Sequence, residues 1–402
     1  MGGSTVNVYS FTREDAKWVA HRGIHEYYKE NTANAFRAAA NMYEIWGIEC
    51  DIWETMHVRP EVELPKKPAD YENVAGQSVE DNNDMVVTAA EDDNLDEHSV
   101  NDTNIDEEPE VLATSTQEDS VQDPKSEAVA GEIQGLEIGS MTDNEILDNS
   151  ETIKASKEKY DKLTPAQKYE VRSILGDDTL KEFLDAAADI AEYESYDLVV
   201  NHDRDFKDVF GVKINVWDIT NDQIKTHPVL GNKVCFLSDF MQICKNSGKV
   251  PVVEIKGEWN SSSDYHMLSD EGARKTVETI VDVGGVSLLK QTKFISFHAA
   301  SLDRIKNYVS TKYKFQPYTI YLINKDGSSK IQLAAEHHYN AVAVTLSMMN
   351  DSFYNLAKYT YGLGVGTWTY RNTSSGRKAL KNHVLSGKYD LEYATIDYDI
   401  FH

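Results

Sequence analysis

Short apolar segments alternate with amphipathic stretches of helical length everywhere in this chain except residues 57–195. Helices are expected at 34–43, 272–283 and 301–309, between segments rich in Val, Ile and aromatic residues. This alternation predicts a parallel sheet covered by helices, and roughly 260 residues with about eight strands favour a closed (β/α)8 barrel of the TIM type. The strand candidates are 18–20, 45–53, 197–200, 250–255, 294–297, 319–323, 341–346, 364–368 and 393–396.

These nine candidates for eight positions leave one segment in excess. Residues 341–346 are a candidate for a strand within a loop, although the apolar pattern alone does not rank the nine. We take 45–53 and 197–200 as the second and third barrel strands, so residues 57–195 form an insertion between them. Its last part, next to the third strand, could carry the chain back to the bottom of the barrel.

The insertion holds almost all of the negative charge of the 402-residue chain. The net charge is −27, and residues 57–195 contain 37 acidic and 11 basic side chains, a net of −26. Within them, residues 68–150 have 24 acidic side chains and a single basic one, Lys125. Because such a segment cannot bury enough apolar surface to offset its chain entropy, we expect 57–150 to be disordered. The barrel should then comprise residues 1–56 and 196–402.

Residues 151–195 differ in composition and should form a small helical segment. Thr164-Pro165-Ala166-Gln167 has a capping threonine, a proline at the first helical position and a glutamine three residues on. The stretch from Tyr160 to Lys168 also resembles small helical modules of surface proteins of Gram-positive bacteria. This likeness favours a secreted or cell-surface location in such a bacterium over the cytoplasm.

Several classes of protein are disfavoured by simple counts. No run of eighteen apolar residues occurs, so we expect no transmembrane segment. Outside the insertion, 30 acidic and 29 basic residues leave no surplus of positive charge for a nucleic acid. The three cysteines, Cys50, Cys235 and Cys244, have neither a disulfide pattern nor a zinc spacing.

Acidic side chains occur in pairs on two of the expected strands. Because side chains alternate along a strand, Glu49 and Asp51 share one face, as do Glu254 and Lys256. Carboxylates side by side repel each other unless a cation lies between them. Three carboxylates from two strands would form an oxygen-only site, which suits Mg²⁺ or Ca²⁺ better than zinc. The alternative is that these are ordinary solvent-facing strand residues.

Two histidines, each beside a charged residue, follow expected strands. His21-Arg22 follows the first strand and His202-Asp203 the third. Since the carboxyl ends of barrel strands form the active-site face, both histidines should surround the same pocket as the carboxylates. A single histidine at a strand end is more often structural than catalytic, but two that flank an acidic triad favour catalysis.

These motifs, in their order, resemble those of the glycerophosphodiester phosphodiesterase family. The likeness covers residues 17–56 and 196–402, and the chain departs from the usual pattern at Lys29, where a proline is common, and in the long insertion. The later segments 294–297, 368–369 and 396–398 resemble further landmarks of the family. The motifs that carry the likeness are Ala20-His21-Arg22-Gly23, Glu30-Asn31-Thr32, Glu49-x-Asp51, Asn201-His202-Asp203 and Glu254-x-Lys256.

The resemblance implies hydrolysis of a glycerophosphodiester, a small-molecule substrate, to glycerol phosphate and an alcohol. It implies a divalent cation, Mg²⁺ or Ca²⁺, and a general acid and base whose order the sequence leaves open. Histidine suits both proton transfers because its pKa lies near neutrality. The implied roles are: metal ligands Glu49, Asp51 and Glu254; acid and base His21 and His202; phosphate binding by Arg22 and Lys256; a wall on the glycerol side from Trp368; and orientation of the site by Glu30 and Asn31.

Two other interpretations remain open at this point. One is a related barrel phospholipase, although the Glu-Asn-Thr and Glu-x-Lys spacings fit it less well. The other is an inactive surface protein that binds lipid head groups or a phosphodiester-containing cell-wall polymer. The alcohol that leaves the phosphate cannot be read from the sequence, and glycerol-phosphate polymers are among the candidate substrates.

Overall fold

A computed structural model describes residues 16–69, 122–259 and 265–401. Contacts within the chain divide it into two units, one of residues 1–60 and 191–402 and the other of residues 61–190. No helix in the described ranges is both long and apolar enough to cross a membrane.

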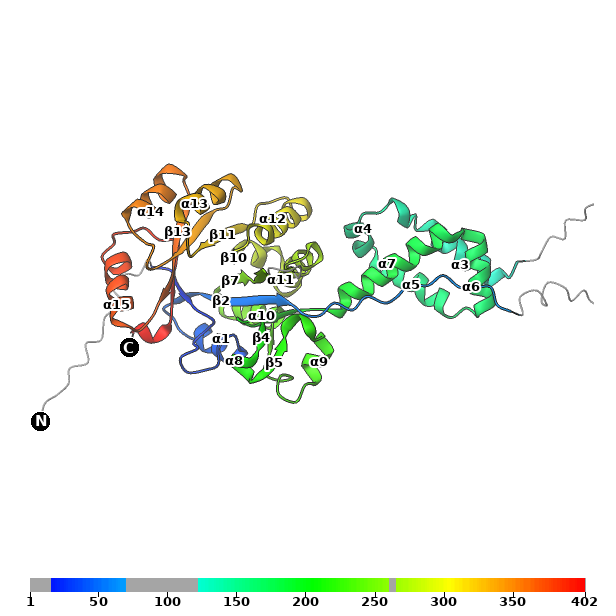
Figure 1. The fold of residues 1–402 in the computed structure, drawn as a ribbon, viewed down its shortest axis with the longest axis horizontal. Helices are drawn as coiled ribbons and strands as arrows, with labels where there is room; N and C mark the ends of the chain where they lie inside the picture. Colours follow the sequence, from blue (N-terminus) through cyan, green and yellow to red (C-terminus); the bar gives the residue numbers. More distant parts are fainter. Residues whose placement is uncertain (1–15, 70–121, 260–264, 402) are drawn as a thin grey trace, which may run out of the picture. The chain divides into compact units, whose positions relative to one another are not determined.

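The first unit contains the expected closed barrel of eight parallel strands (Figure 1). The ring closes because β1 pairs with both β14 and β2. Its strands, in order around the ring, are β1 (Trp18–Ala20), β2 (Ile45–Glu54), β7 (Val250–Ile255), β10 (Lys293–Ser296), β11 (Tyr318–Ile323), β12 (Ala341–Thr345), β13 (Gly364–Tyr370) and β14 (Ala394–Ile396).

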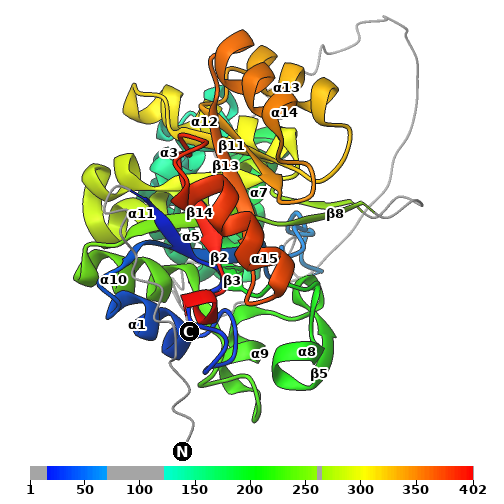
Figure 2. The same ribbon diagram turned by 90° about the vertical axis from the view of Figure 1, so that its left-hand side faces the viewer.

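Helices surround this ring, as the two views in Figures 1 and 2 show. Alternation along each strand sends side chains to two different cores. Val19, Val252 and Ile320 fill the interior of the barrel, whereas their neighbours, such as Ala20 and Val253, pack beneath the helices. The helices are α1 (Ala33–Ala40), α10 (Leu237–Ser247), α11 (Asp270–Gln291), α12 (Ala299–Tyr313), α13 (Gly327–Glu336), α14 (Asp351–Asn355) and α15 (Ser374–Leu380), with π-helical turns at Leu356–Thr360 and Lys381–Leu385.

One expected barrel strand is not part of the ring. Residues 197–200 contain β3 (Leu198–Val200), which runs antiparallel to the end of β2. The third barrel strand is β7, and residues 341–346, which we considered for a loop strand, supply the barrel strand β12. Apolar periodicity indicates that a segment is a strand but does not give its direction, which explains the wrong choice. The insertion still lies between the second and third barrel strands.

Because β3 is antiparallel to β2, the two strands form a hairpin, and the insertion occupies its loop. The Thr55 N–H donates to the Asp197 carbonyl at 3.0 Å, and the Asp197 N–H donates to Thr55 Oγ1 at 2.9 Å. The Val58 N–H donates to Ser195 Oγ at 2.9 Å. The chain therefore leaves and re-enters the barrel unit at one place. It returns to the bottom of the barrel later, through α10, and not through residues 151–195 as expected.

A small group of elements follows β3 in the barrel unit and lies together in Figure 1. Its apolar side chains, including Phe206, Val216 and Leu230, form a separate core against Trp53 of β2. The elements are β4 (Asp205–Phe206), α8 (Lys207–Phe210), β5 (Val212–Asn215), the 3-10 turn Val216–Asp218, α9 (Asn221–Thr226) and β6 (Cys235–Phe236); further along the chain are the hairpin strands β8 (Gly257–Trp259) and β9 (Tyr265–Met267) and the 3-10 turn Tyr398–Phe401.

The second unit is helical and has a core of its own, which includes Ile133, Ile153, Val171 and Phe183. The capping box at Thr164 and Gln167 begins a helix as expected. Its elements are α3 (Pro124–Gly135), the 3-10 turn Ile138–Ser140, α4 (Asp143–Asp148), α5 (Ser150–Asp161), α6 (Pro165–Leu175) and α7 (Asp177–Ser195), whose last residues belong to the barrel unit.

The helical part of the insertion therefore begins well before residue 151. Residues 124–148, which we expected to be disordered, form α3, the 3-10 turn and α4. The many acidic residues obscured the apolar pattern of α3. Val129, Ala130 and Ile133 form its buried apolar face, while most of the acidic side chains around them stay exposed. Of the other residues expected to be disordered, 57–69 form no helix or strand, and 70–121 lie outside the described residues.

The hairpin predicts that the second unit can be removed without unfolding the barrel. Replacing residues 61–190 by a short Gly/Ser linker should leave the melting temperature of the barrel within a few degrees, because short loops cost little to close. Circular dichroism and calorimetry would measure this. As a matched control, a deletion of 55–197 removes the Thr55–Asp197 bonds and should destabilise the barrel. A barrel that unfolds when only 61–190 is removed would contradict the prediction.

Candidate active site

Three carboxylates meet at the carboxyl-terminal end of the barrel. Asp51 of β2 lies beside Glu254 of β7 in the strand register, and Glu49 lies two residues earlier on the same face of β2. One oxygen from each of the three lies within 4.8 Å of the others. Glu49 and Asp51 are only 2% and 1% exposed, so water does little to screen their repulsion.

Two cationic side chains offset part of this charge. Lys256 Nζ donates to Glu254 at 2.9 Å and lies 3.4 Å from Asp51, and Arg22 Nε lies 3.4 Å from Asp51. Burial alone would raise the pKa of Asp51, but Lys256 and Arg22 hold that pKa well below its usual range. Burial and the neighbouring carboxylates Asp51 and Glu254 raise the pKa of Glu49 well above its usual range. Charge compensation is therefore incomplete at Glu49.

A sharp turn after β1 places Arg22. Arg22 and Asn31 have φ angles of 55°, in the left-handed region, and Gly23 has a φ of +81°. A Cβ on Gly23 would also lie 2.6 Å from the Ala35 carbonyl carbon, so glycine is needed there. This turn lets the Arg22 backbone N–H donate to Glu49 at 2.8 Å. Strain of this kind commonly marks a functional site.

Two residues behind the cluster hold it in position, in line with the sequence expectation for Glu30 and Asn31. Both Glu30 oxygens accept from Arg22 Nη1 at 3.0 Å. Asn31 Nδ2 donates to Asp51 at 2.8 Å, while the Asp51 backbone N–H donates to the Asn31 side chain at 3.3 Å.

The donor set fits a divalent cation. Among the described residues, Glu49 Oε1 and Asp51 Oδ1 are buried side-chain oxygens without a hydrogen-bond donor. Three carboxylates, two of them with an unsatisfied oxygen, and no nitrogen or sulfur ligand form the kind of site that Mg²⁺ and Ca²⁺ prefer. Glu49, Asp51 and Glu254 are therefore the residues that could hold the metal.

His21 lies at the end of β1, next to the last strand of the ring. Its Nδ1 is 3.1 Å from an oxygen of Asp397, which also lies 3.1 Å from His25 Nε2. Burial lowers the pKa of His21 to about 4, against the opposing effect of Asp397. Burial opposes ionisation of Asp397, yet its bonds to His21 and His25 hold its pKa below the usual range. A neutral His21 that donates from Nδ1 keeps Nε2 as a proton acceptor.

His202 reaches the site by a route that the sequence analysis did not foresee. It follows the antiparallel β3 rather than a barrel strand, and the Asn201 N–H donates to the Asp51 carbonyl at 3.1 Å. The Asn201 side chain donates to the carbonyls of Asp203 and Asp205 and so orders the loop. His202 Nδ1 lies 2.8 Å from Asp203 Oδ1.

A cavity of about 70 Å³ brings the expected site residues together. Asp51 is not part of the described lining but lies 3.4 Å from Arg22 and Lys256, which are. Trp368 closes one side, with its indole N–H donating to the Ala343 carbonyl at 3.2 Å and its ring 5.6 Å from that of Phe297. Ile295 and Leu322 complete this apolar wall. The expected residues that line the cavity are His21, Arg22, Glu49, His202, Glu254, Lys256 and Trp368.

Residues 194–386 match the model of the glycerophosphoryl diester phosphodiesterase family. This part of the chain, just under half of its length, is similar to that family. The match covers most of the barrel strands as well as His202, Glu254, Lys256 and Trp368.

Several solved structures are similar to this chain. A glycerophosphodiester phosphodiesterase from Agrobacterium tumefaciens is 12% identical, with 95% of this chain and 96% of that chain covered and a TM-score of 0.45. A phosphodiesterase from Oleispira antarctica, in complex with the product sn-glycerol-3-phosphate, is 11% identical, with 95% and 93% covered and a TM-score of 0.48. No curated protein matches the chain.

Asp397 and His25 belong to this candidate site, although the sequence analysis gave them no role. Asp397 directly follows β14, and ring closure places β14 beside β1, which carries His21. A closed barrel was already expected, so a carboxylate after the last strand could have been paired with His21 in advance. His25 had no comparable signal, because it lies in an irregular turn.

The repulsion at Glu49 leads to a prediction on stability. A folded-state pKa above the ordinary value means that stability is present below the ordinary pKa and lost as pH rises. Glu49→Gln, which imitates the protonated form, should therefore raise the melting temperature at neutral pH without metal. It should also reduce the further rise on addition of Mg²⁺ or Ca²⁺. Thermal denaturation with EDTA and with each cation measures both effects, and Glu61→Gln is a control. An equal cation response in wild type and Glu49→Gln would contradict the assignment.

The shared oxygen of Asp397 leads to a second prediction. Asp397→Asn should lower kcat by at least roughly tenfold with little change in KM, because an amide no longer fixes the tautomer of His21. His25→Asn, which removes the other partner of Asp397, should have a smaller effect. Steady-state kinetics over a range of pH would measure both variants. Equal losses in the two variants would mean that Asp397 supports the local structure and not His21 in particular.

Proposed function

We propose that this chain hydrolyses a glycerophosphodiester to glycerol phosphate and an alcohol, with a divalent cation and with His21 and His202 as base and acid. The observation that carries the proposal is one cavity lined by two histidines, two cationic side chains and two carboxylates, Glu49 and Glu254, which cluster with Asp51. Each group answers a need of phosphodiester hydrolysis, namely charge neutralisation and two proton transfers.

The cationic side chains are suited to hold the phosphate. Arg22 and Lys256 both line the cavity, and each is already bound to carboxylates that orient it. Bound Mg²⁺ or Ca²⁺ on Glu49, Asp51 and Glu254 would supply further charge neutralisation at the phosphate oxygens. The apolar wall of Trp368 and Phe297 lies on the side where the carbon atoms of a glycerol group could pack.

The surroundings of the histidines support different roles for them. His21 has a pKa lowered to about 4 by burial, so it is neutral near pH 7 and can accept a proton from the nucleophile. His202 is more exposed than His21 and bonds to Asp203 at the mouth of the cavity. It is placed to give a proton to the departing alkoxide, while a nucleophile's oxygen forms the new P–O bond.

The inactive binding protein considered at the outset has less support than the enzyme. Both histidines, both cationic side chains and two of the three clustered carboxylates line the cavity. The binding protein would not need a buried His21 that is held in one tautomer by Asp397.

Phosphorus NMR of glycerophosphoethanolamine hydrolysis tests this proposal. His21→Ala and His202→Ala should each lower kcat by roughly 10²–10⁴, and the double variant should be little worse than the poorer single one. EDTA should abolish turnover, and Mg²⁺ or Ca²⁺ should restore it. His338→Asn is a suitable control, because His338 is exposed with a φ of 56°, which asparagine tolerates. Full turnover in excess chelator, or in either single alanine variant, would contradict the proposal.

A further inference from the structure

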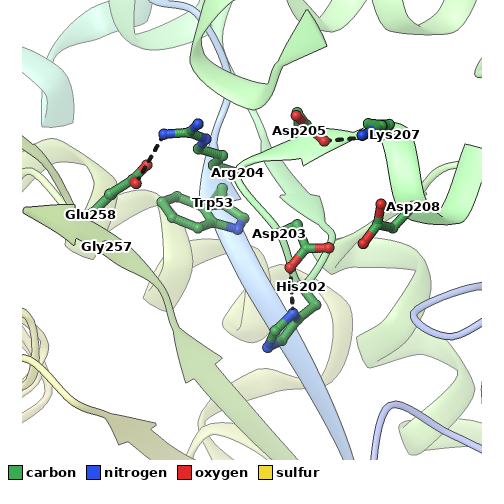
Figure 3. A pocket seen from close by; sticks show the side chains of 9 residues that line it. All are labelled: Trp53, His202, Asp203, Arg204, Asp205, Lys207, Asp208, Gly257 and Glu258. Carbon is green, nitrogen blue, oxygen red and sulfur yellow. Dashed lines mark hydrogen bonds and ion pairs between the residues drawn. The ribbon is translucent and has the colours of Figure 1, made fainter. Parts of the chain in front are cut away.

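A second and larger hollow adjoins the catalytic cavity. This outer bay has a volume of about 460 Å³ and is lined by Trp53, residues 202–205, Lys207, Asp208, Gly257 and Glu258 (Figure 3). His202 lines both the bay and the catalytic cavity, whereas His21 lines only the cavity. The bay therefore begins at His202 and not at His21, the residue proposed to take the proton of the nucleophile.

Two rows of side chains lead from the carboxylate cluster to the bay. On β2, alternation places Trp53 on the same face as Glu49 and Asp51, two residues beyond Asp51. Beside it, Glu254 and Lys256 are followed at the same spacing by Glu258, which lines the bay. A substrate bound at Glu49 and Glu254 would therefore extend toward Trp53 and Glu258.

Trp53 presents a hydrogen-bond donor that the described residues leave unsatisfied. The residue is only 7% exposed, and its indole Nε1 has no hydrogen-bond partner. Figure 3 shows this nitrogen on the side of the ring that faces Asp203 and His202. A buried N–H without an acceptor is unfavourable, so a ligand oxygen in the bay would stabilise it.

The remaining lining offers both donors and acceptors. Asp205 accepts from the Lys207 backbone N–H at 3.0 Å, and Arg204 pairs with Glu258 at 3.1 Å. Asp208 adds a carboxylate that accepts hydrogen bonds, and Lys207 adds an ammonium group that donates them. Hydroxyl groups both donate and accept, so several of them can bind such a mixed lining. A quaternary ammonium group has no donor and prefers an aromatic cage, but Trp53 is the single Trp, Tyr or Phe among the described lining residues.

We propose that the outer bay binds the leaving alcohol and that this alcohol is a neutral polyol, such as glycerol, inositol or a sugar. This inference rests on the proposed function and specifies the substrate class for it. When the bond between phosphorus and the alcohol oxygen breaks, that oxygen takes the proton of His202 and remains in the bay. The nucleophile's oxygen forms the new bond to phosphorus, and its proton goes to His21.

Specificity constants for three diesters test the inference. For glycerophosphoinositol and glycerophosphoglycerol, kcat/KM should exceed that for glycerophosphocholine by roughly tenfold or more. Trp53→Phe keeps an aromatic ring but removes the N–H, so the preference should fall by roughly tenfold. Asp208→Asn should also reduce it, and this exposed position makes a folding defect avoidable. Trp217→Phe, at a ring 5.6 Å from that of Trp53 but outside the bay lining, should leave the preference unchanged.

A binding measurement separates this inference from the proposed function. Saturation-transfer NMR should detect myo-inositol on the wild-type protein, a weaker signal on Trp53→Phe, and little signal from choline. If the diesters are hydrolysed but without preference, or with choline preferred, the polyol inference is overturned and the proposed function stands. If no diester is hydrolysed, the proposed function fails, and absence of inositol binding would then overturn the bay assignment as well.

Discussion

The arrangement of the site depends on holding three carboxylates together out of water. At separations near 4.8 Å, each pair of charges repels by about 3 kcal/mol at an effective dielectric constant of about 20. Arg22 and Lys256 offset most of this repulsion, and the strained turn at Arg22 and Gly23 persists because it directs a backbone N–H at Glu49. Two cations cannot neutralise three anions, and so the cluster favours either a proton on Glu49 or a bound cation. Loss of the cation should therefore weaken both catalysis and the folded state.

Much of the fold could be predicted from the sequence because apolar periodicity reports burial directly. The closed barrel and all of its strand segments were recognised in this way. The direction of 197–200 could not be predicted, because a short apolar strand has the same composition whether it runs parallel or antiparallel to β2. The helices between Pro124 and Asp148 were missed for a different reason. Their acidic surface dominated the composition, although α3 contributes four buried positions and α4 contributes none.

The residues of the site could be predicted more fully than the strands and loops that position them. Glu49, Asp51 and Glu254 come together because strand alternation and the order of parallel strands determine their positions. His202 also lines the cavity, but the expected reason was wrong, since β3 brings it there from the opposite direction. His25 could not be inferred, because its position depends on the path of an irregular turn. Motifs indicate which functional groups a site contains, whereas the path of the loops that position those groups cannot be predicted from composition.

The unusual length of β2 connects the insertion with the site. At ten residues it is longer than its ring neighbours β1, which has three residues, and β7, which has six, and its last residues pair with β3. That pairing brings His202 to the cavity, and it leaves Trp53 at the edge of the outer bay. The bonds between Thr55 and Asp197 close the hairpin before the insertion begins. Changes in the insertion can therefore occur without moving His202, because the hairpin that positions this histidine is completed by residues of the barrel unit alone.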